Sequence, residues 1–296
     1  MGKKKILAVA NNKGGVGKTL ESKILAEYAA CFLEKRVLLV DFDPQTNLSR
    51  RYLKMEVRGN ESTEDFAPPR HPNWPDPEDD DWDGYSSSAE IWKSGDALPY
   101  PLYNENRPDW FKRLFILPGH ATDLGEIELI SKSNLHDQTT KHFKKFMDCP
   151  DVWEEYDLVV IDTRPSKGPL NLSALYAATH LLIPTEAESP SVEGLWGMIG
   201  LRKKTNLMRA PDDQLKMIGI LANKIQKQTV IHREHLELLH NDPDTKGYML
   251  DVSMTHRVAY KELMLEGAPS IWEGNQNRPE VIEMRAVCEA VFSKIF

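Results

Sequence analysis

A glycine-rich segment between an apolar run and a helical pattern is the feature that most limits how this chain can fold. Residues 11–19 have the sequence Asn-Asn-Lys-Gly-Gly-Val-Gly-Lys-Thr; an apolar run, Lys5–Ala10, precedes them, and Leu20–Leu33 has the spacing of a helix with one apolar face. Further apolar runs, separated by helical patterns, follow at Arg36–Asp43, Leu114–Pro118, Asp157–Asp162, His180–Pro184 and Met217–Asn223. Uniformly apolar strands that alternate with helices are typical of parallel sheets covered on both faces. The sequence therefore predicts an α/β fold with a mostly parallel, twisted sheet and helices on both of its faces.

One segment interrupts this alternation. From about residue 56 to residue 110 the chain is rich in proline and acid, and between Glu61 and Asp83 nine acidic residues stand against one basic residue, Arg70. Because the segment fits no periodic element, we expect it to be an insertion that is partly disordered or laid over the surface. The 296 residues are otherwise enough for one large core, so we expect a single domain over residues 1–296 that carries this insertion at about 56–110.

The composition excludes several classes of protein. No apolar run approaches the roughly 20 residues of a membrane helix, and the three cysteines are too far apart to suggest a disulfide framework or a cysteine metal site. We therefore expect a cytoplasmic protein that does not bind membranes. The net charge is −8, so any binding to nucleic acid must use a local basic patch.

The glycine-rich segment has the features of a phosphate-binding loop. Residues 17–19 (Gly-Lys-Thr) match the end of the general loop pattern, although Asn12 stands where that pattern has its first glycine. Inner glycines let backbone N–H groups point at phosphate oxygens, and the following helix N-terminus adds a favourable dipole. Lys18 would neutralise the β- and γ-phosphates, and the Thr19 hydroxyl would bind Mg²⁺. These residues predict that the α/β fold is P-loop NTPase-like.

Acidic residues end two of the predicted strands. Asp41 and Asp43 close the second apolar run, and two residues spaced by two along a strand point the same way. Asp162 ends the most apolar run of the chain, which is the usual pattern for an acid that holds Mg²⁺, commonly through water. At the carboxyl ends of parallel strands these side chains would face the phosphates.

Lys13 links these motifs to a known family. The stretch Lys13–Thr19 (Lys-Gly-Gly-Val-Gly-Lys-Thr) resembles the deviant Walker A box of the ParA/MinD ATPases, and Asp41–Gln45 (Asp-Phe-Asp-Pro-Gln) resembles the D-x-D-P-Q box of the same family. The resemblance covers nearly the whole chain except about residues 56–110, and it is to the short ParA kind, which has no helix-turn-helix domain ahead of the loop. A solvent-exposed Lys13 without a role is the alternative.

The resemblance implies roles for individual residues. It implies that Lys13 reaches across a dimer interface to the partner's nucleotide, that Asp43 positions or activates the attacking water, and that Asp41 joins Thr19 and Asp162 around Mg²⁺. The residues that it implies for binding ATP are Lys13, Gly14, Gly15, Val16, Gly17, Lys18, Thr19, Leu20 and Asn223, with Asn223 as a contact to adenine.

Arg164 departs from the family pattern. After its Asp162 equivalent the family usually continues with Pro-Pro-Ser, whereas this chain has Thr163-Arg164-Pro165-Ser166. Two alternatives stay open for Arg164: it contacts phosphate, or it stabilises a loop.

The resemblance also implies a function. It implies an ATPase that dimerises on ATP, binds nucleoid DNA without sequence preference, and is stimulated by a ParB-like partner to segregate a plasmid or chromosome locus. The basic residues that would form the DNA surface of two paired subunits are Arg202, Lys203, Lys204, Lys227 and Arg257. Binding of this kind uses phosphate contacts and is sensitive to salt. For each of these residues a solvated helix face is the alternative.

Three other functions are weighed against partition. A ParA-like ATPase could position a protein cargo, such as a carboxysome or a chemosensory cluster, through an adaptor protein; no residue separates these cargoes. A metabolic P-loop enzyme is the alternative from a different class, although the cysteines lack the spacing for an iron–sulfur cluster and a metabolic kinase gives no reason for Lys13. A MinD-like membrane ATPase is disfavoured because the last helical segment, Pro279–Phe296, lacks a basic amphipathic face.

Overall fold

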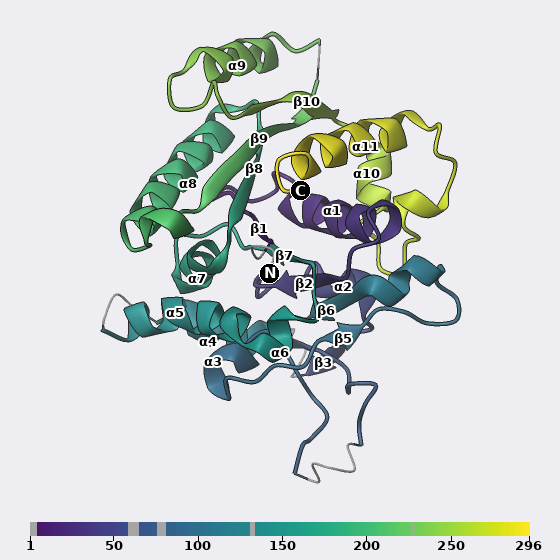
Figure 1. Cartoon of the computed structure of the whole chain (residues 1–296). Helices are drawn as coiled ribbons and strands as arrows, with labels where there is room; N and C mark the ends of the chain where they lie inside the picture. The colour runs from purple at the N-terminus through teal and green to yellow at the C-terminus, as the bar shows by residue number, and fades with distance from the viewer. Residues whose placement is uncertain (1–4, 59–64, 76–80, 131–133, 227) are drawn as a thin grey trace.

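The computed structural model describes residues 5–58, 65–75, 81–130, 134–226 and 228–296 (Figure 1). Within these ranges no helix combines the length and the apolar character that crossing a bilayer requires.

An eight-stranded sheet forms the centre of the molecule. Its strands are β1 (Ile6–Val9), β2 (Val37–Asp41), β5 (Tyr100–Pro101), β6 (Leu114–Leu117), β7 (Leu158–Asp162), β8 (His180–Glu186), β9 (Lys216–Ile225) and β10 (Met249–Thr255). Their order across the sheet is β10-β9-β8-β1-β7-β2-β6-β5, and every neighbouring pair is parallel except β5 with β6. The prediction of an α/β fold with a mostly parallel sheet is confirmed.

Helices cover both faces of this sheet. The longer helices are α1 (Lys18–Phe32), α4 (Ala121–Glu128), α5 (Asn134–Asp148), α7 (Pro169–Ala177), α8 (Ser189–Leu207), α9 (Val230–Asn241) and α11 (Pro279–Phe292). Shorter helical turns are α2 (Ser49–Tyr52), α3 (Glu90–Lys93), α6 (Pro150–Trp153), α10 (Val258–Glu262), η1 (Asp109–Arg113), η2 (Pro211–Asp213) and η3 (Ile271–Glu273). Figure 1 shows α5, α7 and α8 along one face and α1 with α11 on the other.

Side chains from alternate strand positions feed two hydrophobic layers. On β1, Ile6 and Ala8 belong to the layer under α5, α7 and α8, whereas Leu7 and Val9 belong to the layer under α1 and α11. Because both faces are buried, the strands carry no polar face, which is why they appear in the sequence as unbroken apolar runs.

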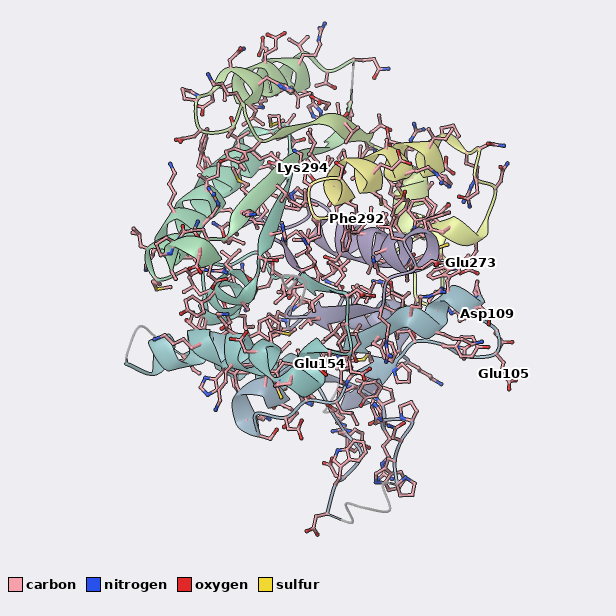
Figure 2. The ribbon with its side chains drawn as sticks, in the orientation of Figure 1. Glu105, Asp109, Glu154, Glu273, Phe292 and Lys294 are labelled. Carbon is pink, nitrogen blue, oxygen red and sulfur yellow. The ribbon has the colours of Figure 1, made fainter. Side chains whose placement is uncertain are left out.

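The end of the chain is fixed against the second layer. Phe292, near the end of α11, is buried, and the Lys294 ammonium donates a hydrogen bond of 2.8 Å to the carbonyl of Ile218 on β9 (Figure 2). α11 thus packs its apolar side chains into this layer.

The parallel register brings residues that are distant in sequence to one edge. Val9, at the end of β1, pairs with Asp162 on β7, which in turn pairs with Asp41 on β2. On the other side of β1, Glu186 at the end of β8 pairs with Asn223 on β9. Four polar side chains therefore lie along the carboxyl edge of the sheet, at or near the ends of their strands: Asp41, Asp162, Glu186 and Asn223.

Residues 56–110, which show no periodic pattern in the sequence, contain short regular elements in the part that the structure describes. β3 (Glu56–Arg58) and β4 (Asp65–Ala67) form an antiparallel hairpin, α3 follows, and β5 extends the main sheet. These elements have two to four residues each, which is too short to give a periodic signal. Ile91 and Tyr100 are nevertheless buried, and the Tyr100 hydroxyl donates to the carbonyl of Pro69 at 2.8 Å.

The same segment is bonded to the carboxyl edge of the sheet. The Ser88 hydroxyl donates to the backbone carbonyl of Asp41 at 2.7 Å, and the Ser88 N–H donates to the carbonyl of Pro118 at 2.8 Å. The described part of the insertion is therefore packed onto the ends of β2 and β6.

Burial of α3 generates a stability prediction. We expect Ile91→Ala to lower the free energy of unfolding by about 2–4 kcal/mol, because Ile91 is 1% exposed and its removal leaves a cavity in the core. Val57→Ala, at a side chain that is 64% exposed, is the matched control and should change it by less than about 0.5 kcal/mol. Urea unfolding of both variants measures the difference; equal effects would show that α3 does not pack into the core.

Candidate functional site

The glycine-rich loop leads from β1 into α1 through a backbone that only glycine adopts readily. Gly17 is the residue before α1 and has φ 100°, in the left-handed region. A Cβ atom at this position would also lie 2.3 Å from Nδ2 of Asn223. Gly17 is therefore required both by its own backbone angle and by the close approach of β9.

Two residues at the end of β9 hold the loop in place. Nδ2 of Asn223 donates to the carbonyl of Val16 at 2.9 Å and to Oε1 of Glu21 at 3.1 Å. The Lys224 ammonium donates to the carbonyl of Gly15 and forms an ion pair of 2.6 Å with Glu186. Asn223, for which the resemblance implies an adenine contact, is thus found in a clamp between β9 and the loop.

Lys18 is a buried cation at the first position of α1. Its ammonium donates to the backbone carbonyl of Lys13 at 3.0 Å, and its side chain lies near the carboxylates of Asp162 and Asp43. Burial lowers the pKa of Lys18, and the two carboxylates oppose this shift. A cation held in this way at the centre of a glycine-rich loop is suited to bind an anion.

Asp162 offers the kind of oxygen ligand that a hard metal cation binds. It is fully buried; its Oδ1 accepts a hydrogen bond of 3.3 Å from Ser22, and its Oδ2 has no hydrogen-bond partner among the described residues. Burial, and next the carboxylate of Asp41, raise the pKa of Asp162 well above its usual range, whereas the Thr19 hydroxyl and the Lys18 ammonium oppose the rise. A buried carboxylate oxygen without a partner, beside a hydroxyl, fits Mg²⁺.

The structure describes no group of three or more His, Cys, Asp or Glu side chains that could hold a metal ion by themselves. A Mg²⁺ ion beside Asp162 and Thr19 would therefore take its other ligands from water and from the phosphates of a bound nucleotide.

The expectation that Asp41 and Asp43 face the same ligand is not met. β2 ends at Asp41, so the alternation of side chains along a strand does not extend to Asp43. Asp43 borders the cavity beside the loop, whereas the Asp41 carboxylate accepts hydrogen bonds from the Asp43 N–H and from the N–H and hydroxyl of Ser49 at 2.7–3.1 Å. Burial raises the pKa of Asp41 to about 6. Asp41 thus anchors the turn that presents Asp43, and its place around Mg²⁺, which the resemblance implies, stays a prediction.

A cavity of about 640 Å³ lies over the loop. Its lining residues are Gly14, Gly15, Gly17, Lys18, Thr19, Leu20, Asp43, Gln45, Asn47, Arg51, Arg164, Pro165, Asn223, Lys224, His256, Arg257, Tyr260, Lys261 and Met264. Six lysines and arginines face a single carboxylate, Asp43, in this lining. In a chain of net charge −8 such a concentration of cations marks a site for a highly charged anion.

Most of the predicted loop residues are brought together here. Of the ATP-binding set, the cavity is lined by Gly14, Gly15, Gly17, Lys18, Thr19, Leu20 and Asn223. Val16 is buried beneath the loop, and Lys13 is exposed outside the cavity. The Lys13 ammonium makes no hydrogen bond or ion pair with the described part of the chain. The backbone of Lys13, in contrast, packs against Gly194 near the start of α8, where an added Cβ would lie 3.1 Å from the backbone nitrogen of Lys13.

Sequence reasoning missed one wall of the cavity. This wall comes from the region of α10 and includes His256, Tyr260 and Met264; no sequence motif in this region indicates a ligand site. Arg257, expected at a DNA surface, also lies in this wall, where its Nε is 3.6 Å from Oε2 of Glu283. The role of Arg257 in DNA binding, which the resemblance implies, stays a prediction. Gln45 also lines the cavity and could have been found from its place in the Asp-Phe-Asp-Pro-Gln stretch.

The other predicted DNA residues lie apart from the cavity. Arg202, Lys203 and Lys204 are in the last turns of α8, roughly 20 Å along the helix from its start beside the loop. Arg202 donates to the carbonyl of Leu215 at 3.0 Å, Lys203 forms an exposed ion pair of 3.1 Å with Asp244, and Lys204 is exposed. Lys227 lies outside the described residues.

Glu21 supplies a pH-dependent prediction. It is fully buried behind the loop, and burial raises its pKa to about 8, with the hydrogen bond from Asn223 opposing the shift and Glu283 adding to it. Because this pKa is higher in the folded chain than in the unfolded chain, the folded chain keeps a proton that the unfolded chain releases, and stability falls as pH rises from about 4.5 to about 8.

We expect Glu21→Gln to remove the loss of stability that Glu21 causes as pH rises. Its free energy of unfolding relative to the parent chain should rise by about 1–3 kcal/mol between pH 5 and pH 8, measured by urea unfolding. The exposed Glu262→Gln variant controls for the loss of one acidic side chain. Parallel pH curves for Glu21→Gln and the parent chain would contradict a protonated Glu21.

Comparison with known proteins agrees with this geometry. The family described as "CobQ/CobB/MinD/ParA nucleotide binding domain" matches residues 7–270. The chromosome-partitioning ATPase Soj of Thermus thermophilus is 31% identical over 234 residues, which cover 77% of this chain and 72% of that protein.

Solved structures share the fold. The apo structure of McdA from Cyanothece has a TM-score of 0.73 at 18% identity, and a plasmid partition protein from Borrelia burgdorferi has a TM-score of 0.66 at 22% identity; each comparison covers 99% of this chain and 100% of the other. The resemblance drawn from Lys13–Thr19 and Asp41–Gln45 is thereby confirmed: this chain belongs to the CobQ/CobB/MinD/ParA family of nucleotide-binding domains.

Proposed function

We propose that this chain is a ParA-type ATPase that binds ATP with Mg²⁺, pairs with a second copy of itself, and uses the cycle to position a cargo on DNA. The observation that supports the proposal most is the cavity over the glycine-rich loop, which is lined by buried Lys18 and by Asp43, with Asp162 near the Lys18 ammonium. Its excess of cations suits a triphosphate.

The loop residues would bind the phosphates. Backbone N–H groups of residues 14–19 and the N-terminus of α1 would surround the phosphate oxygens, with Lys18 as the main counter-charge. Thr19 and Asp162 would hold Mg²⁺, Asp162 through its Oδ2 or through an intervening water. When bound, Mg²⁺ neutralises negative charge that builds up on the phosphates.

Asp43 would orient the water that attacks the terminal phosphate. Its Oδ1 accepts a hydrogen bond of 3.0 Å from the Gln45 N–H, which fixes the carboxylate at the cavity wall and leaves the other oxygen to accept from water. Transfer of the terminal phosphoryl group of ATP to water, with ADP as the leaving group, requires little from the protein beyond such orientation and charge neutralisation, so one fixed carboxylate is sufficient for the role.

Lys13 supports the pairing of two copies. Its side chain is exposed beside the cavity rather than in it, and its own backbone carbonyl holds Lys18. A lysine in this position can reach a nucleotide on a facing subunit while its own loop stays closed. Pairing of this kind would require bound ATP.

DNA binding would use the last turns of α8. Lys203 and Lys204 are exposed, and the exposed ion pair of Lys203 with Asp244 is weak enough to be replaced by a phosphate contact. Two paired copies would double this patch and give salt-sensitive binding to nucleoid DNA without sequence preference. A ParB-like or adaptor protein would stimulate hydrolysis and link the cycle to a plasmid, a chromosome locus or a protein body.

The first test separates nucleotide binding from turnover. We expect Lys18→Ala to lose ATP binding, because the phosphates lose their buried counter-charge. Asp43→Ala should bind ATP with near-parent affinity, hydrolyse it at least about 100-fold more slowly, and accumulate as an ATP-bound dimer. Calorimetry, phosphate release and light scattering measure the three properties. A monomeric Asp43→Ala protein at saturating ATP would contradict the pairing, and normal turnover would show that another residue orients the water.

The second test concerns DNA. With ATP and Mg²⁺, the Asp43→Ala protein should bind double-stranded DNA of any sequence, and its affinity should fall steeply as salt rises. The Lys203→Ala/Lys204→Ala variant in the same background should bind more weakly at low salt and with a smaller salt slope. Lys112→Ala, at an exposed lysine on η1, is the control. DNA retention that is the same with and without ATP would contradict the proposal.

A further inference from the structure

Arg164 lies in the wall of the cavity, in the segment that follows β7. The backbone there is fixed from two sides: the Thr163 hydroxyl donates to the carbonyl of Val9 at 2.9 Å, and Nδ2 of Asn171 on α7 donates to the carbonyl of Arg164 at 2.9 Å. The next residue, Pro165, is in van der Waals range of a Cβ built at Gly14. The start of the Arg164 side chain is therefore held beside the phosphate-binding loop.

The guanidinium of Arg164 has few partners for its five N–H donors. Its Nη1 lies 3.8 Å from Oε1 of Glu128, beyond hydrogen-bond distance. Its Nε is buried and has no hydrogen-bond partner in the described structure. The group borders the cavity together with Lys18 and Asp43, so an anion in the cavity would meet donors that the protein leaves free.

Glu128 has contacts besides Arg164, although its Oε2 is buried and has no hydrogen-bond partner among the described residues. Its Oε1 accepts a short hydrogen bond from the Ser166 hydroxyl. Its carboxylate also presses against Gly168, the residue before α7, where a Cβ would lie 1.9 Å from the Glu128 Oε1. A carboxylate at the N-terminus of a helix is stabilised by the helix dipole. Departure of the Arg164 guanidinium would therefore leave Glu128 with its hydroxyl donor and the helix end.

We propose that Arg164 is a second phosphate-binding cation, which exchanges Glu128 for the terminal phosphate of the bound nucleotide. The proposal rests on the proposed ATP-binding function and adds to it: Lys18 holds any nucleotide, whereas Arg164 distinguishes the triphosphate from the diphosphate. When the terminal phosphate is absent, the guanidinium stays with Glu128. The ion pair thus couples the state of the nucleotide to α4, the helix that carries Glu128.

The opposite outcome, a purely structural Arg164, makes a different prediction. If Arg164 only fixed the loop after β7 through Glu128, the loss of either partner would disturb the same contact. Arg164→Gln and Glu128→Gln would then change ATP and ADP binding in the same direction and by similar factors. The exchange mechanism instead predicts that Arg164→Gln lowers the ratio of ATP affinity to ADP affinity and that Glu128→Gln raises it.

The experiment measures the dissociation constants of ATP and ADP, both with Mg²⁺, in the Asp43→Ala background, where ATP persists. We expect Arg164→Gln to weaken ATP binding about tenfold and ADP binding less than twofold. Arg164→Lys should recover part of the ATP affinity, because it keeps the charge. Glu128→Gln should raise the preference for ATP over ADP at least about twofold, since it frees the guanidinium. Arg36→Gln, which breaks an exposed ion pair of 2.6 Å with Glu155, is the matched control and should leave the preference unchanged.

Three results would overturn the proposal: an ATP preference for Arg164→Gln within twofold of the Asp43→Ala parent, equal weakening of both nucleotides, or a Glu128→Gln variant that loses the preference as Arg164→Gln does. Melting temperatures show whether each variant folds; if Arg164→Gln does not, Arg164→Lys and Glu128→Gln decide the question by the same ratio. Failure of the ATPase proposal itself looks different, because the Asp43→Ala parent with intact Arg164 would then bind neither nucleotide.

Discussion

The burial of one ammonium among carboxylates is the constraint on which the carboxyl edge of the sheet depends. Lys18 is taken out of water at the start of α1, and a buried charge is tolerated only beside charges and dipoles that compensate it. The parallel register places Asp162 directly beside Asp41; both carboxylates are fully buried, and burial raises the pKa of each, while the Lys18 ammonium lies near Asp162 and Asp43. The cavity lining beside these acids, by contrast, holds six lysines and arginines and one carboxylate. A divalent cation that arrives with a phosphate ligand would compensate both groups, because the cation would face the buried acids and the phosphate would face the lysines and arginines.

The loop that carries this cation is held from several strands at once. Asn223 and Lys224 reach it from the end of β9, and the start of α8 packs closely against its first residues. Because these contacts already exist between protein groups, the loop does not need to be ordered by its ligand. Preorganised N–H groups and a fixed lysine bind phosphate without the entropy cost of arranging a flexible chain. The clamp at Asn223 and the positive φ of Gly17 therefore serve the same end as the cavity itself.

The core strands and the glycine-rich loop could be predicted from the sequence because they are repeated, strongly apolar or conformationally unusual. What could not be predicted depends on tertiary contacts. β10 lies at the sheet edge and mixes buried with exposed residues, so it gives no continuous apolar run. The elements within residues 56–110 are too short to show a period. Asp41 was expected to face the ligand, yet the strand ends at that residue and Ser49 captures its carboxylate. The wall near α10 carries no motif, because a cavity can be completed by any side chains that the fold brings there.

The contact between Glu128 and Gly168 also limits which substitutions these two positions can accept during evolution. A methyl group at position 168 would overlap the Glu128 carboxylate at less than 2 Å, and a glutamate that is pushed aside would lose its place near Ser166 and Arg164. Neither position can therefore change freely while the other stays as it is. Among descendants of this chain, alanine at 168 should be accompanied by a shorter or smaller side chain at 128, and lineages that keep glutamate should keep glycine opposite it.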